Sequence, residues 1–172
     1  PCSSSLRRIR SAVNGVAMGG GFEIALACDL IVAADSATFA LPEPKVGLAA
    51  LAGGLLRLPR QIPLKQAMGM ILTGRTVSAE EGAKLGFVNE VVPAGELMAA
   101  ARRWAEQIMA VSPMSVRASK QIVHRGLDAD SVASAYADQN GYPAAVALFR
   151  SADMREGPRA FAEKRAPKWK GK

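Results

Sequence analysis

Two glutamates, Glu23 and Glu43, lie in an apolar stretch that begins with three consecutive glycines at 19–21. The apolar residues 22–28 that follow predict a short helix opened by a glycine turn. The first turn of such a helix leaves backbone N–H groups without intrahelical acceptors, at the positive end of the helix dipole. The pattern therefore predicts a site for a developing negative charge, with the Gly20 amide and the Glu23 side chain on one face of the first turn.

Glu43 lies in the run A-L-P-E-P, with a proline on each side. Because both prolines restrict the backbone, we expect an extended conformation at Glu43 and neither a helix nor a central strand. The apolar neighbours Phe39, Leu41 and Val46 favour a carboxyl group withdrawn from water and suited to donating a proton. Taken singly, each glutamate also fits an ordinary charge in a helix's first turn or in a loop. The presence of both in one short apolar segment favours acid–base chemistry.

Strands on either side of the glycines are expected to position them. One strand ends at residues 12–13, a glycine-rich turn covers 15–21, and the β-branched run at 30–34 predicts a second strand. We expect the first strand to begin no earlier than Ser11, because burying the unpaired charge of Arg10 would cost several kcal/mol.

The composition indicates a globular chain with a substantial core. Of its 172 residues 49% are hydrophobic, which suits one domain of α/β character. Charges interrupt every apolar run before it reaches the length of a membrane span. Cys2 and Cys28 form no disulfide framework, and Cys28 indicates a buried thiol in a reducing compartment. The single histidine, His124, has no cysteine cluster beside it in the sequence, so we expect no metal site.

The net charge of +7 is concentrated at the C-terminus. Residues 150–172 contain eight basic and three acidic side chains, a surplus of five positive charges. Such a tail indicates either an anionic partner, such as a cofactor's phosphates, nucleic acid or a membrane surface, or a solvated and mobile terminus.

The residues after the glutamates are expected to be mainly helical. Ser78 and Glu81 have the spacing of a capping box before a helix at 79–85. Further helices are expected at 95–109, from Pro113, at 130–148 with a break near 141–143, and from about Gly157.

Four longer runs lie in register from about Ala12 toward the C-terminus. They are N-G-V-A-M-G-G-G-F-E-I-A-L-A-C-D, L-P-E-P-K-V-G-L, A-G-G-L-L-R-L-P-R and I-L-T-G-R-T-V-S-A-E-E-G-A-K-L-G-F-V-N-E-V-V-P. Together they resemble the crotonase (enoyl-CoA hydratase/isomerase) family. The resemblance implies an α/β fold, with a crotonase-like (ClpP/crotonase) superhelix of ββα units over residues 1–93 and a helical trimerisation and CoA-contacting region over 94–172. It also implies that the N-terminal part of the usual domain is missing.

In that family the middle glycine of G-G-G-F-E supplies an oxyanion-hole amide, and two glutamates add water across the double bond of an enoyl-CoA thioester. The resemblance therefore implies a lyase of the enoyl-CoA hydratase type, with Gly20 in the oxyanion hole and Glu23 and Glu43 as catalytic residues. Retention of both glutamates favours a hydratase over an isomerase. The residues implied for substrate binding are Met18, Gly19, Pro42 and Leu51.

The C-terminal F-x-E-K-R stretch resembles a segment with which some relatives contact coenzyme A, which implies that Phe161 and Lys164 bind its adenine and 3′-phosphate. An aromatic face and a cation suit these two groups. Coenzyme A would enter as part of the acyl-CoA substrate, with no tightly bound cofactor. The resemblance further implies a cytoplasmic homotrimer or hexamer of fatty acid metabolism. The runs R-L-P-R-Q-I-P and E-G-P-R-A-F-A-E-K-R-A-P-K-W-K-G-K resemble most the crotonobetainyl-CoA hydratase branch.

A short-chain dehydrogenase that uses NAD(P) is one alternative. The glycines at 15, 19 and 21 match its G-x-x-x-G-x-G pattern, and Asp35 follows where an acid could meet a ribose. Neither Tyr136 nor Tyr142, however, begins the Tyr-x-x-x-Lys pair that this family needs.

Two further alternatives involve no catalysis. The basic tail could bind RNA, although only Trp169 supplies the interleaving of aromatic and basic residues that such binding favours, so nucleic acid is not the expected partner. The chain could also be a catalytically inactive crotonase-like fragment that serves only in assembly.

Overall fold

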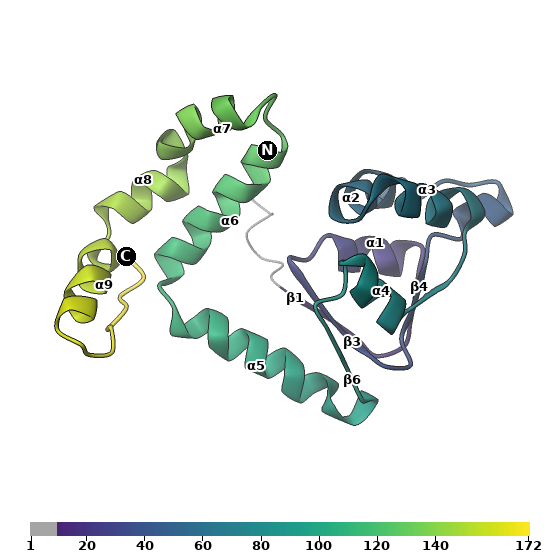
Figure 1. Cartoon of the computed structure of the whole chain (residues 1–172), viewed down its shortest axis with the longest axis horizontal. Coiled ribbons are helices and arrows are strands. Elements are labelled where there is room, and N and C mark those ends of the chain that lie inside the picture. The colour runs from purple at the N-terminus through teal and green to yellow at the C-terminus, as the bar shows by residue number, and fades with distance from the viewer. Residues whose placement is uncertain (1–9) are drawn as a thin grey trace. The chain divides into compact units, whose positions relative to one another are not determined.

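The structure is a computed structural model that describes residues 10–172, so the expectation for Cys2 lies outside it. The described chain divides into two compact units, which we call the sheet unit (residues 10–103) and the helical unit (residues 104–172). The division falls within helix α5 (Leu97–Ala110), which Figure 1 labels. The resemblance implied a boundary between the crotonase-like core and the helical region after residue 93, ten residues earlier.

The sheet unit contains two three-stranded sheets. Parallel strands β1 (Arg10–Val13), β3 (Leu30–Ala34) and β6 (Glu90–Val92) form the first, in the order β1-β3-β6. In the second, β4 (Thr38–Ala40) pairs in parallel with β2 (Val16–Met18) and antiparallel with β5 (Val77–Ser78). The expected strand at 30–34 is confirmed, and β2 lies inside the stretch expected to be a turn.

The register of β2 against β4 positions the site. Met18 lies opposite Ala40 in this parallel pair, so the chain leaves both strands at the same edge of the sheet. The Gly19 N–H donates to the Ala40 carbonyl at 3.0 Å just beyond the last paired residues. The glycine turn after β2 and the Glu43 segment after β4 therefore begin side by side.

Six helical segments complete the sheet unit before α5. They are α1 (Gly20–Leu26), the 3-10 segments η2 (Glu43–Val46) and η3 (Ala94–Glu96), α2 (Gly54–Gln61), α3 (Leu64–Thr73) and α4 (Ala79–Leu85).

Three aromatic rings form the centre of the sheet unit's core. Phe22 of α1, Phe39 of β4 and Phe87 after α4 are buried, with ring centroids between 5.1 and 5.3 Å apart. Gly82 admits the Phe87 ring, because a Cβ at this position would lie 2.7 Å from it. Tilted ring contacts of this kind add to the free energy of apolar burial. They fix α1, and with it Glu23, on the strand that leads to Glu43.

The helical unit contains the second part of α5 and four further helices. These are α6 (Pro113–Leu127), α7 (Val132–Asp138), α8 (Pro143–Arg150) and α9 (Ala152–Ala162), with the 3-10 segment η4 (Gln139–Gly141) between α7 and α8. Ser112, Ser131 and Ser151 cap α6, α7 and α9 through their side-chain oxygens. Helix α6 packs against α8. The expected break near 141–143 is confirmed.

Two expectations about the sheet unit were wrong. Strand β1 begins at Arg10 and not at Ser11, because the Arg10 side chain is exposed and pays no burial cost. Glu43 begins a 3-10 segment and is not extended. Pro44 fits the start of this segment, because a backbone N–H at this position would make no hydrogen bond within the helix.

The capping box and the start of the last helix also differ from expectation. Ser78 accepts the Glu81 N–H at 3.1 Å, but the Glu81 carboxylate pairs with Arg75 at 2.7 Å instead of completing the box. Helix α9 begins at Ala152 and not near Gly157, because Ser151 caps a turn that precedes Pro158. None of the helices between residues 10 and 172 combines the length and apolar character that crossing a bilayer requires.

Candidate active site

The glycine turn gives α1 a first turn with an open backbone amide. Gly19 caps α1 with φ 51° and ψ −122°, a conformation that favours glycine, and its carbonyl accepts the Glu23 N–H at 2.9 Å. The Gly20 N–H has no acceptor among residues 10–172. An amide of this kind at a helix N-terminus is suited to a carbonyl oxygen that gains negative charge.

Glu23 is buried, with 5% of its surface exposed, and its carboxyl group is hydrogen-bonded to helix α2. Its Oε1 accepts the Gly54 N–H, in the first turn of α2, at 2.8 Å. A Cβ on Gly54 would come within 3.1 Å of both Cγ and Oε1 of Glu23, so glycine permits this close approach. The first turn of α2 therefore fixes the position of the Glu23 carboxyl group.

Glu43 brings a second carboxyl group to the glycine turn. A Cβ on Gly19 would lie 2.7 Å from Glu43 Oε1, so the carboxyl group packs directly against the Gly19 backbone. Its other oxygen, Oε2, is buried and has no hydrogen-bond partner within the described part of the chain. Buried polar atoms are usually paired, and an exception of this kind points to a ligand or a reactive role.

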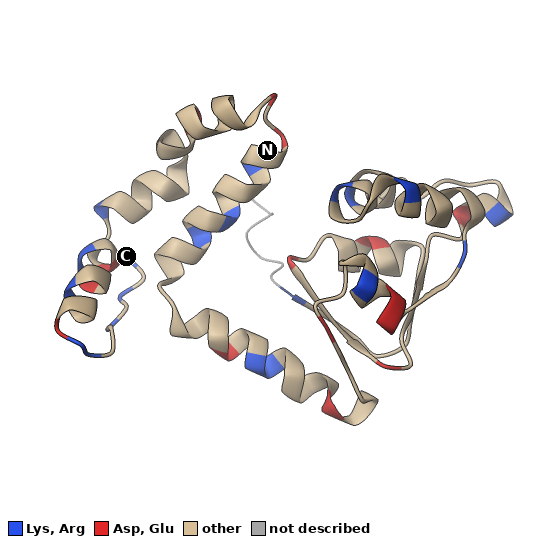
Figure 2. Ribbon diagram, viewed as in Figure 1, with Lys and Arg blue, Asp and Glu red and all other residues tan. Residues whose placement is uncertain are grey.

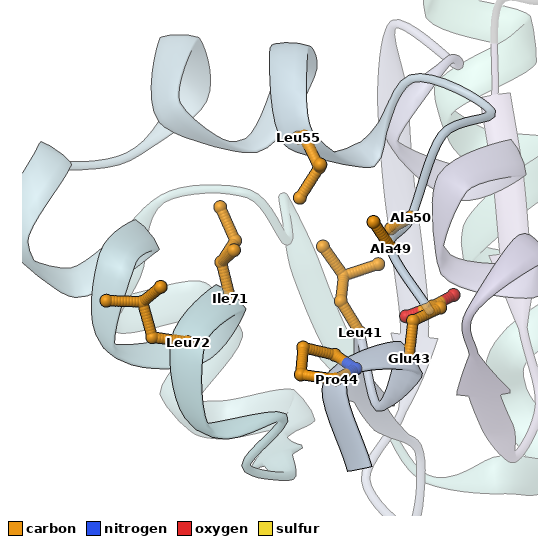
Figure 3. Close-up of a pocket in the computed structure, with 8 residues that line it drawn as sticks. All are labelled: Leu41, Glu43, Pro44, Ala49, Ala50, Leu55, Ile71 and Leu72. Atoms are coloured by element: carbon orange, nitrogen blue, oxygen red, sulfur yellow. The ribbon is translucent and has the colours of Figure 1, made fainter. Parts of the chain in front are cut away.

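An aliphatic hollow of about 130 Å³ adjoins Glu43. Figure 3 shows Glu43, Ala49 and Ala50 on one side of it and Ile71 and Leu72 of α3 on the other. Its full lining is Leu41, Glu43, Pro44, Ala49, Ala50, Leu55, Ile71 and Leu72. One carboxylate on an otherwise apolar wall can contact a small apolar group next to a reacting atom.

The structure thus brings together Gly19, Gly20, Glu23 and Glu43 around one turn. Met18 and Pro42 immediately precede Gly19 and Glu43 in the chain. Leu51, expected to bind substrate, does not line the hollow and is 84% exposed. Its role stays a prediction.

Phe161 and Lys164 belong to the helical unit. Phe161 lies in the last turn of α9 and is 87% exposed, and its carbonyl accepts the Lys164 N–H at 3.1 Å. Lys164 has φ 53°, the left-handed region that residues other than glycine seldom adopt. This bend ends the helix and leaves both side chains open to solvent.

Sequence reasoning missed two parts of the site. The Gly54 amide, which donates to Glu23, was not among the expected site residues. Ile71 and Leu72 of α3 form the far wall of the hollow, and neither was among the expected site residues. No group of three or more His, Cys, Asp or Glu side chains that could hold a metal occurs between residues 10 and 172.

Solved structures of enoyl-CoA hydratases share this fold. The enzyme from Mycobacterium tuberculosis H37Rv superposes with a TM-score of 0.90 at 44% identity, over 96% of this chain and 64% of that one. The enzyme from Mycobacterium marinum gives 0.89 at 44% identity, with the same coverage. These similarities define an α/β fold of the crotonase class.

The sequence profile of the enoyl-CoA hydratase/isomerase family matches residues 8–172. The carnitinyl-CoA dehydratase of Salmonella typhi is 47% identical over 167 residues, which are 94% of this chain and 62% of the relative. The chain therefore belongs to the enoyl-CoA hydratase/isomerase family, and it spans less than two thirds of the length of these relatives.

Family membership also decides against the dehydrogenase interpretation. Gly15 leads into strand β2 and not directly into a helix, so the spacing of glycines at 15, 19 and 21 does not form a strand–turn–helix phosphate loop.

Proposed function

We propose that the protein is an enoyl-CoA hydratase, a hydro-lyase that adds water reversibly to the double bond of a 2-enoyl-CoA thioester. The observation that carries this proposal is the convergence of Glu23 and Glu43 on the turn that also presents the Gly20 amide. The family match supports the reaction class.

In the proposed reaction the thioester oxygen accepts a hydrogen bond from the Gly20 N–H, which stabilises charge as the enolate develops. One water lies between Glu23 and Glu43. One glutamate takes a proton from this water as its oxygen bonds to C3, and the other delivers a proton to C2, which gives syn addition. We favour Glu43 as the proton donor and assign no fixed acid and base beyond that.

The remaining residues would bind the substrate. Met18, Gly19, Pro42 and Leu51 would line the path of the thioester, and Phe161 and Lys164 would contact the adenine and 3′-phosphate of coenzyme A. Coenzyme A is then part of the substrate, with no tightly bound cofactor. Assembly as a homotrimer or hexamer in the cytoplasm belongs to the same proposal.

The hollow beside Glu43 supports a small, uncharged acyl group. Seven of its eight lining residues are aliphatic or proline, and Glu43 is its only charged one. The carnitinyl group named for the Salmonella typhi relative carries a quaternary ammonium, which would lose hydration against such a wall. We therefore expect crotonyl-CoA to be a better substrate than crotonobetainyl-CoA.

The test measures hydration of both thioesters by a protein of the relatives' full length. We expect turnover on crotonyl-CoA, and a loss of at least about a hundredfold in Glu23→Gln and in Glu43→Gln with little change in KM. Glu80→Gln, at an exposed position on α4, is the matched control and should retain the parent rate. Hydration that survives in either variant would contradict the paired glutamates, and a parent protein without hydratase activity would contradict the function.

A further inference from the structure

The last eight residues of the helical unit, 165–172, lie against α5 and α9, and we call them the C-terminal strap. Trp169 donates its Nε1–H to the Ala110 carbonyl at 3.0 Å, and its ring lies against Gly157, where a Cβ would come within 3.3 Å of it. The basic tail is therefore bonded to the helical unit, which disfavours its interpretation as a solvated terminus.

Asp153 holds the end of the strap. This carboxylate is 3% exposed and accepts the Ser112 hydroxyl at 2.8 Å, the Lys170 N–H at 2.7 Å and the Gly171 N–H at 3.2 Å. Burial alone would raise the pKa of Asp153, but the bonds from Lys170, Ser112 and Gly171 together lower it below its ordinary value. The carboxylate of Asp153 is thus bonded to donors within the helical unit.

Glu156 and Glu163 hold the start of the strap. Glu156 accepts two bonds from Arg165, at 2.6 and 3.1 Å, and the Lys168 N–H at 2.7 Å. The Arg165 bonds, followed by the Lys168 N–H, lower the pKa of Glu156 to about 2. Glu163 accepts bonds from Arg159 at 2.8 Å and from Arg165 at 2.6 Å. Both acids are therefore paired with arginines.

A groove of about 510 Å³ lies between α9 and the strap. Its lining residues are Ala152, Arg155, Glu156, Arg159, Glu163, Arg165, Lys168 and Lys170, five cations against two acids. The two acids are those already paired, whereas the side chains of Arg155, Lys168 and Lys170 have no anionic partner among residues 10–172. Figure 2 shows Lys and Arg along α9 and the C-terminal segment.

We propose that this groove binds a diphosphate or a small phosphate ester of similar charge. The three unpaired cations converge on a concave surface, and the bonds to Asp153 and Glu156 fix the backbone of the strap before any ligand arrives. Arginine and lysine donors fixed in this way suit phosphate oxygens. The strap's aromatic ring, Trp169, is half-buried, with one edge against Gly157 and its Nε1–H bonded to Ala110, so the groove favours a compact anion over RNA.

This site is separate from the proposed contacts of Phe161 and Lys164, neither of which lines the groove, and it does not depend on hydratase activity. A diphosphate could reach the groove as the free anion or as part of coenzyme A. Titration with coenzyme A distinguishes these sources. If the diphosphate arrives as part of coenzyme A, replacing the groove's cations should weaken the binding of coenzyme A. If it arrives as the free anion, the affinity for coenzyme A should not change.

The test is calorimetric titration of the 172-residue chain with inorganic diphosphate at fixed ionic strength. We expect saturable binding that Arg155→Gln/Lys168→Gln weakens at least about tenfold, as expected for two charge-assisted contacts. The control, Arg150→Gln/Lys172→Gln, removes the same charge from positions that do not line the groove and should change affinity less than about twofold. Thermal unfolding checks that each variant is folded, and Lys170→Gln replaces the first pair if that pair unfolds.

Three results would overturn the proposal. They are the absence of saturable diphosphate binding, equal weakening by the two pairs, and tight binding of an RNA oligonucleotide that falls in equal steps as each tail cation is replaced.

Discussion

Two sets of carboxylates, one in each unit, differ in how completely their oxygens are bonded. In the helical unit, Asp153 and Glu156 accept bonds on both oxygens from backbone amides, a hydroxyl and an arginine. In the sheet unit, Glu23 accepts one backbone amide, and Glu43 has a buried oxygen without a partner within the described residues. A carboxylate that is fully bonded stabilises a fold, whereas an incompletely bonded one can still exchange a proton with a bound water.

The largest expected effect separates these two roles. Glu43→Gln should lower hydratase turnover by at least about a hundredfold and leave the unfolding temperature close to that of the parent. Asp153→Asn should do the reverse, because an amide group facing three donors loses hydrogen bonds that a carboxylate accepts. Turnover and thermal unfolding of both variants, in a protein of the relatives' full length, check the difference.

The contrast between the two carboxylates is contradicted if one variant loses both turnover and thermal stability. An Asp153→Asn protein that unfolds as the parent does would show that the bonds of this carboxylate are not structural. A Glu43→Gln protein that loses stability and activity together would make Glu43 a structural residue as well.

A smaller effect is expected at the glycine that touches Glu43. Gly19→Ala places a Cβ 2.7 Å from Glu43 Oε1 at a φ of 51°, so we expect a cost of about 1–2 kcal/mol in stability and a displaced carboxyl group. Turnover should fall by roughly tenfold, because the reacting groups lose their alignment. Gly21→Ala is the control, since its Cβ would meet nothing within 4 Å. Equal stability and turnover of the two variants would contradict the close packing of Glu43 against Gly19.

The sequence indicated Gly20 and Glu23 because local spacing alone places an amide and a carboxylate on one helical turn. The contact of Glu43 with Gly19 depends on the pairing of Met18 with Ala40 between strands β2 and β4, neither of which was expected. The amide of Gly54 reaches Glu23 across 31 residues, and no local pattern encodes such a contact.

Errors at the ends of elements have the same origin. Residues before proline tend to avoid the helical region, which favoured an extended Glu43. A single 3-10 turn that begins at Glu43 needs no hydrogen bond from the nitrogen of Pro44, so proline does not prevent it. The helix expected from about Gly157 begins five residues earlier, at Ala152, and contains Pro158. The bonds that Asp153 and Glu156 accept from the strap stabilise the turns before this proline, and they join residues distant in sequence.

The smallest expected effect is a pH dependence in the helical unit. The Arg165 bonds hold the pKa of Glu156 at about 2, below its ordinary value of 4.5. Because the folded-state pKa is the lower one, this carboxylate stabilises the unit above about pH 4.5 and loses that contribution as pH falls toward 2. Unfolding temperatures measured from pH 7 to pH 2 should fall less steeply in Glu156→Gln than in the parent. Parallel curves would show that the Glu156 bonds contribute nothing to the fold.

The central claim is that Glu23 and Glu43 act as one unit on one water. The most direct measurement is the turnover of Glu23→Gln, Glu43→Gln and the double variant on crotonyl-CoA, in a protein of the relatives' full length. If the two carboxylates share one step, the double variant should be about as slow as the slower single variant, because removing either already abolishes that step. Losses that multiply, so that the double variant is slower by the product of the two single effects, would contradict the shared water and assign the glutamates to independent roles.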